Sequence, residues 1–279
     1  MLSASDISGE QIKENKTLAV VINSRKNQSE CFDAIRLLQM TALFPIHVYF
    51  YKNNGVSLTS VYNEIQKQIT EERILFIHDD VQILTVGWAK ELDRLFNDNP
   101  EYGIIGVAGS RDFDSDGAWW IYKNIYGQVV HTKQIKDEKT GQQGTTAFIT
   151  KFSEKIENDL NEVAVIDGLF MAIDRAKAST NFDEHVSGFN FYDIDFCLSN
   201  YTTNTTKIGV TTKIKVQHGG VGVIKPEWFE NRNLVLSKYK EYLPISDLNN
   251  STQPEKKDMA FFHNEHFPVQ NAETQIENK

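Results

Sequence analysis

Residues 74–80 read Ile-Leu-Phe-Ile-His-Asp-Asp, and this stretch decides the fold. Its four unbroken apolar residues have the pattern of a strand buried on both faces, as in a parallel sheet. Ligands of open α/β sheets bind beyond the carboxyl ends of such strands, so His78, Asp79 and Asp80 stand where a ligand is expected. Hard oxygen ligands at this place suit Mg²⁺ or Mn²⁺ with a phosphorylated substrate. The alternative is that the aspartates only cap the next helix.

Two strand and helix pairs precede this stretch. Residues 18–23 and 47–51 read as strands, and residues 29–40 and 58–70 carry apolar residues at helical spacing. The resulting order β-α-β-α-β is typical of a parallel, doubly wound half-domain.

The pattern changes after a further helix expected over residues 88–96. Residues 112–161 mix polar residues with glycine and tryptophan, which predicts loops and short antiparallel strands laid over the sheet. Residues 208–218 alternate apolar and polar, which predicts one strand that ends at a histidine, His218, on its apolar side. A last helix is predicted over residues 227–242.

The length, charge and cysteine content of the chain limit the kinds of protein that it can be. With 279 residues, of which 40% are hydrophobic, the chain can form one large domain or a domain with extensions. A formal net charge of −9 argues against nucleic acid as a partner, because binding needs cations against the phosphates. Cys31 and Cys197 match no zinc or disulfide spacing, so we expect two buried small hydrophobes in a reduced compartment.

The chain shows no targeting or membrane-spanning signal. Its N-terminus lacks the features of a signal peptide, and no apolar run reaches the roughly 18 residues of a membrane span. These features predict a cytoplasmic protein, and a peripheral position at the inner membrane face stays open. We divide the chain into a polar leader (1–16), one domain (17–225), and a C-terminal helix with a polar tail (226–279). Phenylalanines within 261–267 of this tail could dock on the core, a partner or a membrane surface.

Five short motifs follow one another along the domain. They are Ser60-Val-Tyr-Asn-Glu-Ile, Leu75-Phe-Ile-His-Asp-Asp-Val, Gly106-Val-Ala-Gly-Ser with Trp119-Trp120, Asp167-Gly-Leu-Phe-Met-Ala-Ile, and Phe182-Asp-Glu with Gly188-Phe-Asn-Phe-Tyr-Asp-Ile-Asp-Phe-Cys-Leu. In this order they resemble family 2 of the GT-A glycosyltransferases, and within it the StrF-type domain of streptomycin biosynthesis.

The resemblance implies a fold and an activity. The fold is α/β, with a mixed, mainly parallel sheet flanked by helices and a helical or irregular C-terminal extension. The activity is transfer of a sugar from a nucleotide-diphosphate sugar, most often a UDP-sugar, to a hydroxyl of a bacterial-type glycan or glycolipid acceptor.

The resemblance also implies a metal site. A divalent metal that bridges the departing diphosphate acts as a Lewis acid. Asp80 matches the Asp-x-Asp-type site and is taken as the direct ligand of Mn²⁺ or Mg²⁺, while Asp79 is left to the metal, the ribose or a supporting contact. The triplet begins with His78 where the family has Asp. His218 looks like the histidine that some GT-A enzymes add as a ligand, with an ordinary strand-end histidine as the alternative.

A catalytic base completes the implied mechanism, because direct inversion needs a carboxylate across the sugar from the diphosphate. The segment before residue 196 resembles the family's Glu-Asp-x-Asp motif, with Asp193 on the base and Tyr192 in place of Glu. In a helix Asp193 and Asp195 lie about 200° apart, so they cannot face the same acceptor. Asp195 is therefore expected to stabilise the helix N-terminus, which is also the alternative role for Asp193.

The donor-site candidates lie at strand ends and on the second helix. Asn23, Ser24 and Arg25 end the first strand where the nucleotide base is expected, and Arg25 adds positive charge. Asn53 stands near the position of the Asp that often reads uracil in the family. Asn63 matches a polar position near the ribose or the phosphate. Each is also common as a turn or capping residue.

Two further sites flank the donor sugar. Asp167 and Gly168 match the family's loop that approaches donor and acceptor, and glycine permits close approach of the backbone. Trp119 and Trp120 could stack on a sugar face or belong to the core.

Three hypotheses remain open from the sequence. The leading one is a metal-dependent, inverting glycosyltransferase. The second is a noncatalytic domain that binds nucleotide-sugar or glycan, motivated by His78 and Tyr192 at positions where carboxylates are usual. The third is a sugar nucleotidyltransferase, ranked last because an early Gly-rich, cation-containing loop for a triphosphate is missing.

Overall fold

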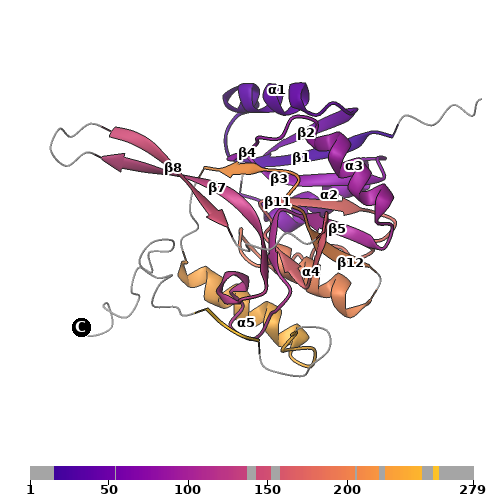
Figure 1. Cartoon of the computed structure of the whole chain (residues 1–279), viewed down its shortest axis with the longest axis vertical. Coiled ribbons are helices and arrows are strands. Elements are labelled where there is room, and N and C mark those ends of the chain that lie inside the picture. Colours follow the sequence, from indigo (N-terminus) through magenta and orange to yellow (C-terminus); the bar gives the residue numbers. More distant parts are fainter. Residues whose placement is uncertain are drawn as a thin grey trace, which may run out of the picture.

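The computed structural model describes residues 16–53, 55–136, 143–151, 158–204, 206–219, 224–246 and 254–257 (Figure 1). The predicted leader, apart from Lys16, and residues 258–279 of the polar tail lie outside this described part of the chain. The expectations for the tail phenylalanines therefore stay untested.

A seven-stranded sheet with the order β2-β1-β3-β11-β5-β12-β9 forms the centre of the molecule. Its strands are β1 (Leu18–Ser24), β2 (Ile46–Lys52), β3 (Arg73–His78), β5 (Tyr102–Gly106), β9 (Asn161–Val163), β11 (Phe170–Asp174) and β12 (Lys207–Val210). Strands β2, β1, β3, β5 and β12 run in one direction, whereas β11 and β9 run in the other. The sheet is thus mixed and mainly parallel, as the sequence predicts.

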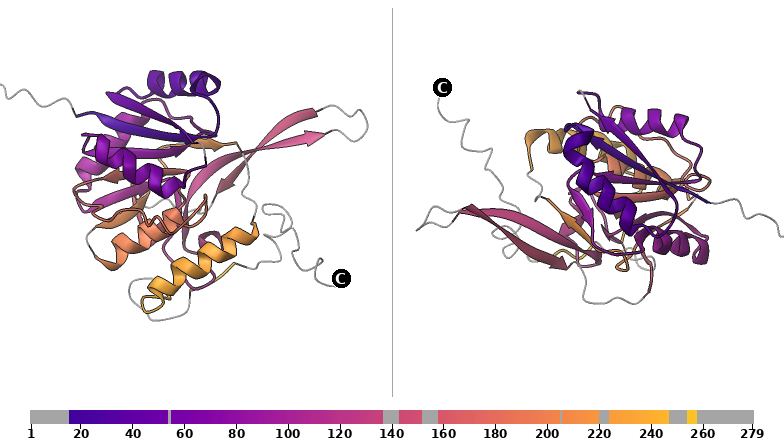
Figure 2. Two further views of the ribbon diagram at one scale, coloured as in Figure 1. Left: turned by 180° about the vertical axis from the view of Figure 1, so that it is seen from behind. Right: turned by 90° about the horizontal axis from the view of Figure 1, so that it is seen from above.

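Helices cover both faces of this sheet (Figures 1 and 2). They are α1 (Phe32–Thr41), preceded by the 3₁₀ turn η1 (Gln28–Cys31), α2 (Leu58–Gln68), α3 (Trp88–Asp98), α4 (Tyr192–Thr202) and α5 (Pro226–Tyr239). On one face α3 packs on α1, where the Trp88 indole N–H donates to the Leu38 carbonyl at 3.2 Å. The other face carries α2 and α4. Because β3 is covered on both sides, the tetrad 74–77 is at most 1% exposed.

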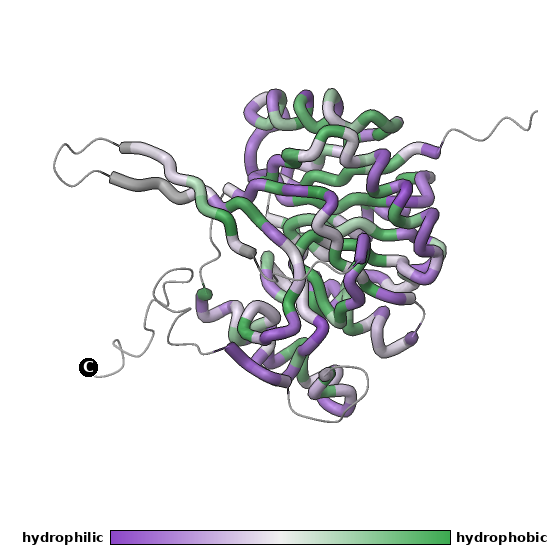
Figure 3. Tube along the Cα trace, in the orientation of Figure 1, coloured by the Kyte–Doolittle hydropathy of each residue, from purple (hydrophilic) through white to green (hydrophobic). Residues whose placement is uncertain are grey.

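The apolar residues are concentrated along the central strands, and polar and apolar residues alternate along the helices (Figure 3). Both cysteines are free and buried, Cys31 to 5% exposure and Cys197 to 0%, as expected for small hydrophobic residues.

A second sheet lies beside the first and has the order β10-β6-β7-β13-β4, with β8 paired to β7. Its strands are β4 (Val81–Ile83), β6 (Ala108–Ser110), β7 (Ile125–Lys136), β8 (Gln143–Lys151), β10 (Val165–Ile166) and β13 (Val216–His218). The prediction of only short strands over 112–161 is wrong, because β7 has 12 residues and β8 has nine.

The β7–β8 hairpin extends away from the body of the molecule (Figures 1 and 2). Residues 144–147 are exposed, so this part of β8 buries no face that would impose a period of two on the sequence. This explains why polar composition predicted loops and short strands here.

The single strand predicted over 208–218 is also wrong, because the chain bends after Val210. Strand β12 belongs to the central sheet and β13 to the second sheet, with residues 211–215 between them. The apolar period continues across the bend because Ile208, Val210, Ile214 and Val216 are all buried. The bend brings His218 beside β4, where it pairs with Val81.

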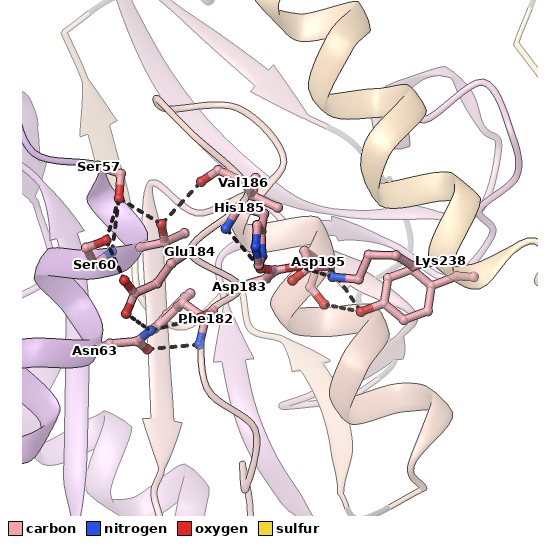
Figure 4. A network of polar contacts seen from close by, with 12 residues as sticks. Ser57, Ser60, Asn63, Phe182, Asp183, Glu184, His185, Val186, Asp195 and Lys238 are labelled. Carbon is pink, nitrogen blue, oxygen red and sulfur yellow. Dashed lines mark hydrogen bonds and ion pairs between the residues drawn. The ribbon is translucent and has the colours of Figure 1, made fainter.

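A network of polar contacts fastens the connection between β11 and α4 to α2 (Figure 4). The Asn63 amide donates to the Phe182 carbonyl at 2.9 Å and to the Glu184 carboxylate at 3.0 Å. The Ser60 hydroxyl donates to Glu184 at 2.8 Å. This network holds the chain segment that leads into α4.

The same network holds α5 on α4 (Figure 4). The Lys238 ammonium pairs with Asp195 and, at 2.7 Å, with Asp183, and the Tyr239 hydroxyl donates to Asp195 at 3.0 Å. Asp195 lies in the first turn of α4, as the predicted role at the helix N-terminus requires, and it also binds a neighbouring helix. Its effect on the helix N-terminus stays a prediction.

Candidate functional site

Three potential metal ligands meet beyond the carboxyl end of β3. His78 ends β3, Asp80 lies in the turn to β4, and His218 ends β13. One ligand atom from each lies within 4.8 Å of the other two, and the His218 Nε2 to Asp80 Oδ1 distance is 3.4 Å. The structure thus brings the predicted ligands Asp80 and His218 together. It adds His78, which the sequence analysis did not assign as a ligand, although its place in the Asp-x-Asp-type triplet was the available signal.

The protonation states of His78 and Asp80 suit a cation, whereas His218 must lose its proton to coordinate one. Burial lowers the pKa of His78, so its imidazole is neutral at pH 7. Burial opposes the ionised forms of Asp80 and His218, yet their hydrogen bond lowers the pKa of Asp80 and raises that of His218. Two imidazole nitrogens with one carboxylate oxygen form a donor set that fits a divalent first-row transition metal.

Tyr192 contacts His78 directly. Its hydroxyl lies 2.8 Å from His78 Nε2, and its side chain is only 2% exposed. A Cβ atom at Gly168 would lie 2.1 Å from the Tyr192 hydroxyl oxygen, so only glycine leaves room for this hydroxyl. The two positions that depart from the family pattern, His78 and Tyr192, are therefore hydrogen-bonded to each other.

Asp193 lies at the start of α4 and faces the same site. The Gly168 N–H donates to its Oδ2 at 2.7 Å, and the Ile194 N–H donates to its Oδ1 at 2.9 Å. Burial, and then the charge of Asp167, raise the pKa of Asp193 to about 7. A fixed carboxylate with a pKa near neutrality can accept a proton at physiological pH.

A strained residue directs α4 into the site. Phe191 precedes the helix with φ +68° and ψ −2°, in the left-handed region that non-glycine residues rarely adopt. Such backbone strain costs on the order of 1–3 kcal/mol and clusters at functional sites.

Asp167 and the predicted loop connect the two halves of the site. The Leu169 N–H donates to Asp167 Oδ1 at 3.0 Å, and the Leu169 carbonyl accepts from the His78 N–H at 3.2 Å. The loop that positions Asp193 through Gly168 is therefore bonded to the end of β3.

A cavity of about 200 Å³ opens between these groups and an aromatic wall. Its lining carboxylates and imidazoles belong to His78, Asp167, Asp193 and His218, together with His131 from β7, which the sequence analysis did not single out. Its aromatic wall consists of Trp119 and Trp120 of the 3₁₀ turn η2 (Trp119–Ile121), Phe189, Phe191, and Trp228 of α5. The tryptophan pair left open by the sequence thus lines the cavity.

Asn23 carries a buried amide without a partner. It is 7% exposed, and neither its Nδ2 nor its Oδ1 has a hydrogen bond within the described part of the chain. It lies at the carboxyl end of β1, in register with His78 on β3. Buried polar groups are usually hydrogen-bonded, so this amide is available to a ligand at the strand end.

Asp79 is turned toward the end of β1. Its Oδ2 accepts from the Ser24 hydroxyl at 2.5 Å and lies 3.4 Å from the Lys26 ammonium. Ser24 is 3% exposed, so this contact is held in place. Asp79 and Asp80 therefore serve different neighbours, although they are adjacent in sequence.

The remaining donor-site candidates are more dispersed. Asn53 closes its own turn by donating to the Val56 carbonyl at 2.9 Å, and Asn63 is engaged in the network of Figure 4. Arg25 is exposed and lies over the ring of Phe189 at 5.2 Å. The structure does not bring Asn53 and Asn63 into the cavity, and their contact with a nucleotide stays a prediction.

Among the described residues, no helix combines the length and the hydrophobicity that crossing a bilayer requires.

Solved glycosyltransferases are similar to this chain in structure. GalNAc-T7 with UDP, GalNAc and Mn²⁺ matches at a TM-score of 0.50 and 11% identity, over 85% of this chain and 53% of that chain. S. aureus TarS 1–349 with UDP matches at a TM-score of 0.46 and 12% identity, over 85% and 67% of the two chains. This chain spans about half the length of the GalNAc-T7 chain. The likeness to GalNAc-T7 shows the fold, which is the mixed α/β fold of GT-A glycosyltransferases.

The comparison with curated proteins gives no significant match. A family model described as "Glycosyltransferase like family" matches residues 17–239, which is most of the chain and includes α5. The chain therefore belongs to this glycosyltransferase-like family.

Proposed function

We propose that the protein is a metal-dependent, inverting glycosyltransferase of the StrF type. It moves a sugar from a nucleotide-diphosphate sugar, a UDP-sugar, to a hydroxyl of a glycan or glycolipid acceptor. The observation that carries this proposal is a cavity lined by His78 and His218, which with the adjacent Asp80 are the potential metal ligands, and by the fixed carboxylate of Asp193, whose pKa is about 7.

The proposed roles follow from these positions. His78, Asp80 and His218 would hold the metal, which when bound supplies Lewis-acid stabilisation for the departing diphosphate. Asp193 would take the proton of the acceptor hydroxyl, and its two backbone N–H contacts fix its direction. Asn23 would meet the nucleotide with its unpartnered amide.

Asp79 completes the proposed donor site. Together with Ser24 and Lys26 it forms a polar group at the end of β1 that suits the hydroxyls of a ribose. The Lys26 ammonium adds a local positive charge that the acidic chain as a whole lacks.

Calorimetric titration of the purified protein tests the donor class. UDP, GDP, CDP and dTDP are each titrated with Mn²⁺ and with EDTA. We expect UDP to bind in the presence of Mn²⁺ and to lose most of its affinity in EDTA. Binding of none of the four would refute the proposal, and binding of UDP without hydrolysis or transfer of any UDP-sugar would favour the noncatalytic alternative.

The donor set predicts a preference for Mn²⁺ over Mg²⁺. Mg²⁺ favours oxygen ligands, whereas two of the three potential ligands here are imidazoles. We expect Mn²⁺ to bind the complex with UDP at least about tenfold more tightly than Mg²⁺. Titration of each metal into protein saturated with UDP measures this ratio, and equal affinities would contradict the assigned ligands.

Tyr192→Phe is expected to weaken metal binding while preserving the fold. The variant keeps the buried ring, which packs against Tyr62 and Phe182 at centroid distances of 5.9 and 6.3 Å, and removes only the hydroxyl that orients His78. Loss of such a supporting contact costs about 10-fold or more in metal affinity. The measurement is Mn²⁺ titration in the presence of UDP.

Tyr49→Phe is the matched control for this variant. Tyr49 lies on β2, and its hydroxyl donates to the Glu71 carboxylate at 3.1 Å. The control variant therefore loses one tyrosine hydrogen bond, as Tyr192→Phe does, but far from His78, Asp80 and His218. An unchanged Mn²⁺ affinity in Tyr192→Phe would show that the Tyr192 hydroxyl does not orient His78 for metal binding.

A further inference from the structure

The aromatic wall of the cavity is unusually rich in tryptophan. Three of the four tryptophans in the chain line it, Trp119, Trp120 and Trp228. The Trp120 ring lies 6.0 Å from Trp119 and 6.2 Å from Trp228 between centroids. Trp119 and Trp228 are buried, whereas Trp120 is half-buried, so its ring is the most accessible surface of the three.

The wall is held in position from outside by a second segment of the chain. The Lys257 N–H donates to the Ile121 carbonyl at 2.8 Å, and the Lys256 ammonium pairs with Asp114 at 2.8 Å. Asp114 also accepts from the Tyr122 hydroxyl at 2.7 Å. These contacts enclose the turn that carries Trp119 and Trp120, so the wall is organised before any ligand binds.

Apart from its histidines, the described residues that line the cavity carry charge only on carboxylates. Asp167 and Asp193 line it, and no lysine or arginine is among the described residues that do so. Arg25 and Arg232 lie over the rings of Phe189 and Trp228 without lining the cavity themselves. An anionic group beside these carboxylates would lose hydration without gaining a partner, which is costly in a partly buried site.

We propose that this cavity binds the acceptor as an uncharged sugar ring stacked on Trp120, and that it rejects acceptor rings bearing a carboxylate or phosphate. Aromatic rings bind the C–H face of a sugar, and Asp193, which lines the same cavity, can accept a hydrogen bond from a ring hydroxyl. This inference rests on the proposed glycosyl transfer and names the class of its acceptor.

Tryptophan fluorescence gives a direct test, because three of the four tryptophans line the cavity and the fourth, Trp88, is fully buried in the core. The probes are the methyl glycosides of glucose, galactose and N-acetylglucosamine, with methyl glucuronide and methyl galacturonide as charged counterparts. Each is titrated into the protein saturated with UDP and Mn²⁺. We expect at least one neutral glycoside to change the emission, and its uronide to bind at least tenfold more weakly.

Matched variants locate the binding. Trp120→Ala should weaken binding of the neutral glycoside at least tenfold, and Trp120→Phe should restore part of it. Phe229→Ala is the control, because Phe229 contacts Trp228 from the same helix but does not line the cavity. Titration of UDP with Mn²⁺ into each variant checks that the fold is retained.

Two outcomes would overturn the inference: a uronide that binds as tightly as its neutral partner, or no response to any neutral glycoside. Failure of the proposed function is a separate result, because it shows as loss of metal-dependent UDP binding. A protein that binds UDP and hydrolyses a UDP-sugar but ignores neutral glycosides would keep the function and lose only the acceptor class.

Discussion

Asp193→Asn should lower glycosyl transfer by about 10²- to 10⁴-fold, the usual contribution of a general base. The amide keeps the shape of the side chain, but its single oxygen can accept from only one of the Gly168 and Ile194 N–H groups, and it cannot take a proton from an acceptor hydroxyl. The measurement is transfer from a UDP-sugar at saturating donor, with UDP affinity as the control. Full activity in this variant would remove Asp193 from the mechanism.

The same residue sets the expected pH dependence of the wild-type enzyme. Asp193 accepts a proton only when ionised, and burial with the charge of Asp167 raises its pKa to about 7. We therefore expect kcat/KM to rise with pH through about pH 7 and to level off above it. A profile that is flat between pH 5.5 and 8.5 would contradict this assignment.

Asp193→Asn is also expected to stabilise the protein above neutral pH. The native pKa of about 7 exceeds the ordinary value of 3.8, so the native state binds this proton more tightly than the unfolded state. The wild type therefore loses stability as the pH rises from about 4 to about 7, whereas the variant lacks this loss. Because Asp193 is partly exposed, we expect a gain on the order of 1–2 kcal/mol at pH 8 relative to pH 4.5.

Thermal unfolding of both proteins at several pH values checks this expectation. Asp33→Asn is the control, since it makes the same chemical change at an exposed carboxylate of α1, outside the cavity. Parallel stability curves for wild type and Asp193→Asn would show that the folded protein does not hold the proton. A catalytic group that costs stability is the trade-off expected of an active site.

The sequence predicts the parts of the fold that are buried on both faces. The tetrad 74–77 is a strand because covering it on both sides requires apolar residues at every position, and this pattern is visible without a structure. The length of the β7–β8 hairpin was not predicted because much of β8 is exposed, so its sequence shows little alternation of apolar and polar residues. The bend after Val210 was not predicted because the alternation of apolar and polar residues continues through it.

In the candidate site, too, the sequence predicts individual residues but not the contacts between them. Asp80 and His218 could be named from motifs, but their pairing depends on the antiparallel contact between β4 and β13, which joins residues 138 positions apart. His78 and Tyr192 each look like a departure from the family pattern when taken singly. Only the folded chain shows that they bond to each other, because that contact also depends on the absence of a side chain at Gly168.

Asp80→Asn is expected to abolish metal-dependent nucleotide binding and, with it, transfer. Asp80 supplies the one negative charge among the three potential ligands, and His78 and His218 are neutral when they coordinate a metal. We expect the affinity for Mn²⁺ in the presence of UDP to fall at least about 10²-fold, beyond the 10- to 100-fold that supporting contacts cost. Calorimetric titration of Mn²⁺ measures the loss.

Comparison of Asp80→Asn with Asp79→Asn, at the neighbouring aspartate, distinguishes loss of metal binding from a general effect of losing one carboxylate charge. Asp79→Asn carries the same charge change, but Asp79 contacts Ser24 and Lys26 at the end of β1, so Mn²⁺ affinity should change less than tenfold. A bound ligand stabilises the native state by mass action, so Mn²⁺ with UDP should raise the melting temperature of wild type and Asp79→Asn but not of Asp80→Asn. The reverse pattern would move the metal from the β4–β13 side of the turn to the end of β1, and would reassign Asp79 as its carboxylate ligand.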